Sequence, residues 1–190
     1  MKITKISLIV GLVFLAIGVS LILYIFSSQA VSATDIINPP EFKISQSAPN
    51  DTEIIGMPDE LIIPSLKMDL KVIPGYYNAK TQTWNLTLNE VQYATITPEP
   101  NDLEGDTFFY GHYRTEVFAY LHTIKGNAQA IVKTTNGHTF YYQLSSIRTT
   151  TPYDDSVFSY SGPPILTIQT CTGLFFQNRQ FYTFNLEKVV

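Results

Sequence analysis

The chain contains a single cysteine, and its position is typical of a nucleophile on a sheet. Cys171 follows the apolar and β-branched run 165–170, and Gly173 comes two residues later. This pattern predicts a strand that stops at a loop, with the thiol at the rim of the sheet. A thiol reacts as the thiolate, so it needs a base or a positive charge nearby. The alternative is an inert cysteine that behaves as a small buried apolar side chain.

Three histidines are candidate partners for this thiol. His138 follows a turn and is expected to face solvent, and His122 lies in a short stretch with helical character. His112 comes directly after Gly111 at the end of the expected strand 107–110, which is the same kind of strand end as that of Cys171. An imidazole in such a place can act as a general acid or base. The alternative for His112 is a structural histidine with satisfied hydrogen bonds.

Arg179 lies eight positions after Cys171, at the start of the last expected strand. A connection of this length allows the strand to fold back antiparallel beside the strand of the cysteine. Alternation then puts Arg179, Phe181 and Thr183 on one face. A guanidinium is always charged and offers several fixed donors, which suits it to polarise a carbonyl oxygen. The alternative is a surface arginine.

Short extended runs separated by Pro and Gly must position these residues. We expect strands at residues 61–63, 68–73, 107–110, 130–134, 139–144, 165–171 and 181–186. The pair Asn136-Gly137 between two of these runs predicts a hairpin. Helical character is limited to residues 116–124 and 89–93. The spacing favours a small, mainly β domain, either a barrel or a sandwich.

Taken together, these motifs resemble the sortase family of cysteine transpeptidases. Residues 167–171 read Thr-Ile-Gln-Thr-Cys, similar to the family's Thr-Leu-x-Thr-Cys signature, with Ile in place of Leu. Residues 109–112 read Phe-Tyr-Gly-His, similar to the family strand that ends in the catalytic histidine. Arg179 falls where the family has its oxyanion-stabilising arginine. The resemblance covers residues 61–190 and implies a closed eight-stranded sortase-type β-barrel with one or two short helices.

The resemblance also implies a reaction and its partners. Sortases cut a C-terminal sorting signal of the Leu-Pro-x-Thr-Gly type and transfer the protein to an amine of a cell-wall precursor or of another protein. Cys171 would form the thioester, His112 would exchange protons with the two amines, and Arg179 would donate hydrogen bonds to the oxyanion. Thr170 would be a polar contact beside the nucleophile. No cofactor and no metal site are implied.

Substrate selection would fall to the segment between Arg148 and Ile165, which corresponds to the family loop that cradles the Leu and Pro of the signal. It offers apolar side chains that could pocket a Leu and a conformationally fixed Pro. The residues expected to bind substrate there are Pro152, Tyr153, Val157, Phe158 and Tyr160.

The N-terminus contains 21 residues without a charge, 6–26, which predict a transmembrane helix. At about 1.5 Å per residue, such a helix spans roughly 30 Å of hydrocarbon. Lys2 and Lys5 precede it, so the positive-inside rule puts the N-terminus in the cytoplasm and the domain outside the cell membrane. A cleaved signal peptide is the alternative, although its apolar core is usually about 7–15 residues.

The predicted organisation is therefore a single-pass membrane protein with three parts. Residues 1–26 would form a cytoplasmic tip and an anchor in the lipid bilayer, and residues 27–60, rich in Ser, Pro, Asn and Asp, an extracytoplasmic linker. Residues 61–190 would form the catalytic barrel.

Charge excludes some functions and leaves others open. The formal net charge is −4, without any cluster of Lys and Arg, so the sequence lacks the electrostatic footprint of a nucleic-acid-binding protein.

The acidic residues between 99 and 106 are expected to form a solvated loop, with calcium binding as the alternative. A papain-like protease is disfavoured because the histidine precedes the cysteine here. A non-enzymatic, surface-anchored β-sandwich, acting as an adhesin or binding module, remains the alternative to the enzyme.

Overall fold

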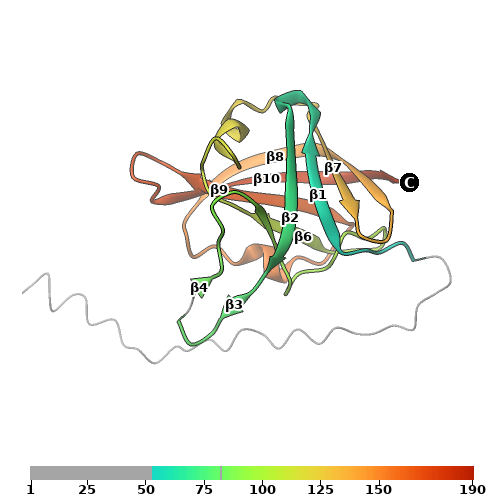
Figure 1. Ribbon diagram of the computed structural model, residues 1–190, viewed down its shortest axis with the longest axis horizontal. Helices are drawn as coiled ribbons and strands as arrows, with labels where there is room; N and C mark the ends of the chain where they lie inside the picture. The colour runs from blue at the N-terminus through green and yellow to red at the C-terminus, as the bar shows by residue number, and fades with distance from the viewer. Residues whose placement is uncertain (1–52, 82) are drawn as a thin grey trace, which may run out of the picture. The chain divides into compact units, whose positions relative to one another are not determined.

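Eight strands close into a barrel in the computed structural model, which describes residues 53–81 and 83–190 (Figure 1). Around the barrel the order is β1-β2-β5-β6-β9-β10-β8-β7. The strands are β1 (Pro58–Ile63), β2 (Met68–Gly75), β5 (Val91–Ala94), β6 (Asp106–Tyr110), β7 (Gln129–Thr134), β8 (Thr139–Thr150), β9 (Ile165–Thr172) and β10 (Asn178–Val189). The predicted closed β-barrel is confirmed, and the sandwich architecture is excluded.

Short elements complete the described part of the chain. A two-stranded ribbon, β3 (Tyr77–Asn78) and β4 (Thr83–Trp84), follows β2. The 3₁₀ helices are η1 (Pro64–Leu66), η2 (Ala119–Thr123) and η3 (Ser156–Ser159). The expected helical character of residues 116–124 is confirmed by η2. The hairpin expected at Asn136-Gly137 joins β7 and β8, and Gly137 has the positive φ of 91° that such a turn requires.

The second expected helix, residues 89–93, is wrong, because most of this segment lies in strand β5. All four residues of β5 are buried. It pairs in parallel with β2 and antiparallel with β6, so both of its edges are hydrogen-bonded, and the burial of all four residues shows that both of its faces are covered. Four residues are too few for a sequence period to distinguish a strand from a short helix, which is why the segment was assigned wrongly.

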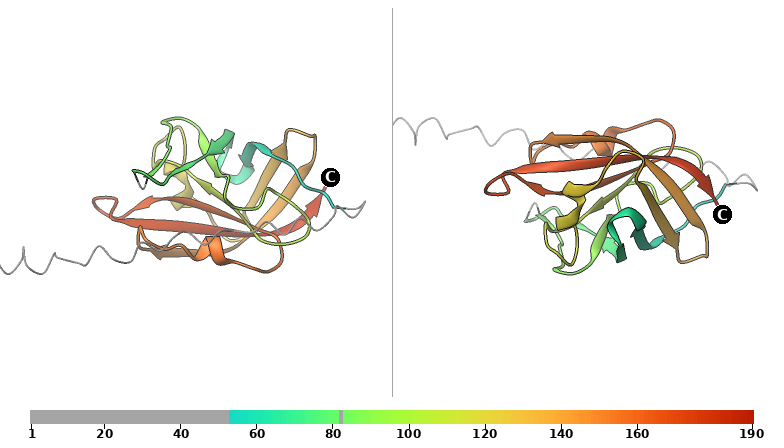
Figure 2. Two further views of the ribbon diagram at one scale, coloured as in Figure 1. Left: turned by 90° about the horizontal axis from the view of Figure 1, so that it is seen from below. Right: turned by 90° about the horizontal axis from the view of Figure 1, so that it is seen from above.

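Strand β9 lies between the two other strands that carry candidate residues. It pairs in parallel with β6, with Tyr110 opposite Gln169 at the end of the ladder. On its other side it pairs antiparallel with β10, with Arg179 opposite Cys171. Figure 2 shows that the loop between β9 and β10 extends beyond the barrel, at the end opposite the C-terminus.

The apolar side chains form two clusters on opposite faces of the sheet. The barrel interior contains Phe109, Ile168 and Tyr182, together with apolar residues from other strands. Their neighbours along the strands point outward, because side chains alternate between the faces. The second cluster, here called the outer cluster, consists of Ala94, Phe108, Tyr110, Val157 and Phe181, with Trp84 and Phe158 packed against it.

One residue of the acidic segment before His112 differs from the expected solvated loop, because Glu99, Asp102 and Glu104 are partly or fully exposed and Asp106 is buried. Asp106 is only 3% exposed, and its carboxylate accepts a hydrogen bond from Thr167 Oγ1 at 2.7 Å. Burial raises the pKa of Asp106 to about 7, although the bonds from Thr167 and the charge of Arg148 oppose this shift. Within residues 53–81 and 83–190, no three metal-ligating side chains gather closely enough to hold an ion.

The predicted membrane anchor and most of the predicted linker lie outside the described residues. Among the residues that are described, no helix has both the length and the apolar character needed to cross a bilayer.

Candidate active site

The pairing of β9 with β10 brings Cys171 and Arg179 together on one face. They are direct partners in the antiparallel register, so their Cα atoms lie about 5 Å apart and their side chains point to the same side. This is the outer face, because Cys171 alternates with the buried Thr170 and Ile168. Both side chains are partly exposed. Arg179 Nη1 donates to the carbonyl oxygen of Phe176 at 3.2 Å, which leaves the guanidinium other donors for a ligand.

The parallel pairing of β6 with β9 places His112 in line with Cys171 and Arg179, and these three residues are here called the outer row. Gly111 N donates to Gln169 O at 3.2 Å, which continues the ladder past the end of β6. Continued by one more residue, this register places His112 opposite Cys171, on a strand about 4.8 Å away. The carbonyl oxygen of His112 accepts bonds from the backbone of Arg114 at 2.9 Å and Phe118 at 3.2 Å, which fixes the loop after it. The structure thus brings Cys171, His112 and Arg179 together across three neighbouring strands.

Thr170 joins two of these strands from the inner face. It is 2% exposed, and its hydroxyl donates to the carbonyl oxygen of Gly111 at 3.1 Å. This bond connects the nucleophile strand to the strand end that carries His112. In the structure, the Thr170 side chain lies on the inner face of the sheet, opposite to the face of Cys171 and Arg179.

Two of the five residues expected to bind substrate belong to the outer cluster. Val157 is buried, and Phe158 lies edge-on to Phe108 at 5.9 Å between ring centroids. Both come from η3, which the loop between β8 and β9 holds against the outer face of the sheet. This is the same face that carries Cys171 and Arg179.

The other three are not members of the outer cluster. Pro152 is exposed, and Tyr153 is 91% exposed. Tyr160 is partly exposed, and its hydroxyl donates to Pro163 O at 2.9 Å, within the same loop. Their part in substrate binding stays a prediction.

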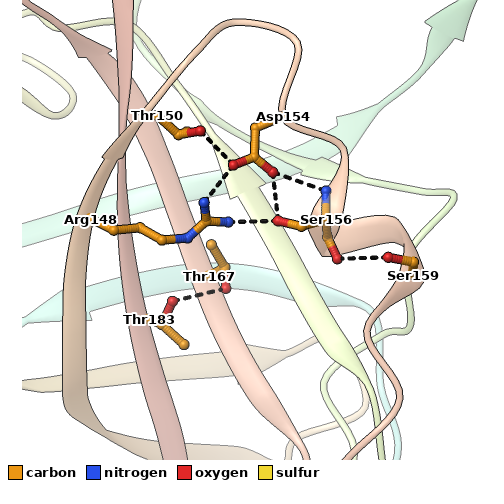
Figure 3. Close-up of polar contacts among 7 residues, drawn as sticks. All are labelled: Arg148, Thr150, Asp154, Ser156, Ser159, Thr167 and Thr183. Atoms are coloured by element: carbon orange, nitrogen blue, oxygen red, sulfur yellow. Dashed lines mark hydrogen bonds and ion pairs between the residues drawn. The ribbon is translucent and has the colours of Figure 1, made fainter.

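A polar cluster fixes the start of this loop on β8 (Figure 3). The Asp154 carboxylate pairs with Arg148 and accepts hydrogen bonds from Thr150 and Ser156. The bonds from Arg148 and from the two hydroxyls hold the pKa of Asp154 well below its usual range. The guanidinium of Arg148 also donates to Ser156 Oγ at 2.6 Å and lies 4.5 Å from the ring centroid of Phe181. The loop that carries η3 is thus tied to the strand beside β10.

Sequence reasoning did not find a cavity on the inner side of β9, at the mouth of the barrel. Its volume is about 240 Å³. Tyr113 forms part of its wall, with its ring 5.8 Å from Phe176 and 6.1 Å from His122. The lining residues are Tyr113, His122, Thr170, Cys171, Thr172, Gly173, Phe176, Gln180 and Tyr182. These come from three separated segments, and no motif in the sequence links them.

The rings of Tyr113, Phe176 and Tyr182 form part of the cavity wall. Burial and the neighbouring Tyr113 raise the pKa of Tyr182 to about 12, so its hydroxyl stays protonated at neutral pH. His112 and Arg179 do not line this cavity, so Cys171 stands between two different surroundings. One is the outer row of charged and titratable groups, and the other is this inner cavity.

The outer row is suited to acyl transfer. A thiolate can attack a carbonyl, an imidazole can exchange protons with the leaving and entering groups, and a guanidinium can stabilise the negative oxygen that develops. The three groups are held by regular strand pairing, which provides the fixed geometry that this chemistry requires.

Known proteins resemble this chain in sequence and in fold. Residues 61–186 match the family model of the sortase domain. The fold is similar to sortase E1 from Streptomyces coelicolor with a tripeptide in its active site, at 23% identity and a TM-score of 0.56, covering 71% of this chain and 90% of that chain. It is also similar to sortase C1 from Streptococcus suis, at 20% identity and a TM-score of 0.54, covering 72% and 74%. No curated protein matches the chain.

Proposed function

Since the chain belongs to the sortase family of cysteine transpeptidases, we propose that it cleaves a C-terminal sorting signal of the Leu-Pro-x-Thr-Gly type and transfers the protein to an amine. The observation that carries this proposal is the row of Cys171, His112 and Arg179 across β9, β6 and β10. Each of the three strands supplies one of the groups that acyl transfer needs.

The proposed reaction has two steps. The Cys171 thiolate attacks the Thr carbonyl of the signal, the Thr–Gly bond breaks, and His112 gives a proton to the leaving glycine amine. The acceptor amine then attacks the thioester, loses a proton to His112, and releases the thiolate. Arg179 donates hydrogen bonds to the carbonyl oxygen while it carries negative charge in each step. An amine, not water, completes the cycle and restores the starting protonation states.

The proposed cellular setting follows from the N-terminal sequence. Residues 6–26 would anchor the chain in the cell membrane, with the catalytic domain on the extracytoplasmic side. The substrates would be surface proteins with a sorting signal, and the acceptor an amine of a cell-wall precursor or of another protein. Protease treatment of intact cells tests this placement, because it should digest the domain without lysis. Protection of the domain would refute it.

The reaction is tested with the full chain, a quenched Leu-Pro-x-Thr-Gly peptide and an added amine. We expect turnover to fall below detection in Cys171→Ala. We expect it to fall by about 10²–10⁴ in His112→Gln. In Arg179→Gln, which removes the charge, we expect a fall by about 10²–10³. Mass spectrometry without the amine should detect the peptide acyl group on Cys171. Turnover that persists in Cys171→Ala would refute the mechanism.

A further inference from the structure

The outer cluster begins directly beside the proposed catalytic row. Tyr110 precedes His112 by two residues, and Phe181 follows Arg179 by two residues. Both therefore lie on the same face as the catalytic row, one side-chain position along each strand, or about 7 Å away. Gln169 stands between Tyr110 and Phe181 in the register. An extended peptide with its scissile carbonyl at Cys171 covers this distance with two residues.

Trp84 closes the outer cluster on its solvent side. Its indole lies edge-on to Tyr110 at 5.3 Å and is stacked on Phe158 at 6.0 Å, with an interplanar angle of 11°. Phe158 in turn lies edge-on to Phe108. Trp84 and Phe158 are both only partly buried, whereas Phe108 and Tyr110 beneath them are buried. The stacked pair thus separates the deeper rings from solvent.

Direct contacts fix the ribbon that carries Trp84 relative to β6. The hydroxyl of Tyr110 donates to the carbonyl oxygen of Asn85 at 2.9 Å. Asn85 also bonds to Tyr76 through backbone and side chain, at the other side of the ribbon. At the end of β2, a Cβ on Gly75 would lie 2.3 Å from the Tyr110 hydroxyl, so the close approach requires a glycine there. Figure 1 shows β3 and β4 projecting from the barrel beyond the end of β2.

Resting on the proposed function, we propose that Trp84 is a substrate-contacting residue that selects the apolar part of the sorting signal. The residues preceding the scissile bond lie between Trp84 and Phe158, and the two rings separate to admit them. When Trp84 and Phe158 separate, they lose their stacking contact. A proline ring or a branched aliphatic side chain of the signal then packs on the deeper rings of Phe108 and Tyr110 and replaces that contact. Trp84 thereby forms a wall opposite η3, so substrate selection involves the ribbon as well as the loop between β8 and β9.

The chain offers a direct probe of this contact because Trp84 is its only tryptophan. We would titrate full-length Cys171→Ala, which cannot turn over, with a Leu-Pro-x-Thr-Gly peptide and follow tryptophan emission. We expect a saturable change in emission, with a midpoint equal to that from the anisotropy of a labelled copy of the peptide. A peptide with Ser at the Leu and Pro positions should produce neither signal at the same concentrations.

Steady-state kinetics give a second test. Trp84→Ser in the otherwise native chain should raise KM about tenfold or more, with kcat within about threefold, since the residue contacts the signal away from the reacting carbonyl. Trp84→Phe should restore most of the loss. Tyr120→Ser is the matched control, because Tyr120 is an exposed aromatic residue that lies outside the outer cluster and outside the expected substrate-binding residues. Its KM should equal that of the wild type.

The outcomes separate this inference from the proposed function. Peptide binding seen by anisotropy without any change in Trp84 emission would overturn the inference and leave the transpeptidase proposal intact. The same holds if Trp84→Ser leaves KM unchanged. A wild-type chain that neither binds nor cleaves any sorting peptide would overturn both.

Discussion

Replacing Thr170 with valine tests how the strand ends of Cys171 and His112 are held in register. Valine keeps the shape and volume of threonine closely but lacks the hydroxyl. The Thr170 hydroxyl donates to the carbonyl oxygen of Gly111, one residue before the histidine. The substitution therefore removes one interaction between the strands without opening a cavity.

The expected loss of stability follows from the burial of both groups in the Thr170–Gly111 hydrogen bond. Thr170 is 2% exposed and Gly111 is buried, so water cannot readily replace the lost donor. An unsatisfied buried acceptor lowers stability by about 1–3 kcal/mol. We also expect kcat to fall between roughly tenfold and a hundredfold, because small displacements of reacting groups have effects of this size.

Thr170→Ser is the matched control, since it keeps the hydroxyl and loses only a methyl group. Burial of a methyl group stabilises by about 1 kcal/mol, so the serine variant should also be less stable. Its kcat should stay near that of the wild type. Urea unfolding and peptide cleavage at saturating peptide would be measured on all three proteins. Equal activity of the valine variant and the wild type, or equally low activity of both variants, would refute the positioning role.

Two further predictions concern charged residues outside the catalytic row. The pKa of Asp106 is raised from 3.8 to about 7, so ionisation opposes folding and the free energy of unfolding should fall by about 3 kcal/mol between pH 5 and pH 8. In Asp106→Asn, the free energy of unfolding measured with urea should lose this pH dependence. A variant with the same pH dependence as the wild type would contradict the assignment of the effect to Asp106. Asp154→Ala should lower stability by about 1–2 kcal/mol, because Arg148 is 44% exposed and water replaces part of its ion pair. Amide exchange at Ser156 should rise as well, whereas Asp155→Ala should leave it unchanged.

Much of the fold could be predicted from local patterns. A few neighbouring residues are enough to indicate most of the strands and the hairpin at Asn136-Gly137. The same is true of the short helical element near His122. Strand β5 was missed because its four residues are too few for a sequence period to distinguish a strand from a short helix. The ribbon was missed because each of its strands has only two residues, too few for any period to appear.

The candidate site was predictable where a motif lies at a strand end. Cys171, His112 and Arg179 each end or begin an expected strand, and the register joins them in one row. Residues that act through contacts distant in sequence could not be found this way. Trp84 contacts Phe158, which lies 74 positions later in the sequence, and only the folded chain reveals this contact.

The parallel pairing of β6 and β9 has a consequence for when the chain becomes reactive. The Thr170–Gly111 bond links positions 59 residues apart, and Arg179 arrives only with β10. Contacts of such long range form slowly, because loop-closure entropy opposes them until most of the structure is in place. A newly made chain therefore carries its sulfur for some time without an imidazole or a guanidinium beside it. Under the proposed function, we expect Cys171 to become reactive only when folding is complete, which would limit premature acylation of the nascent protein.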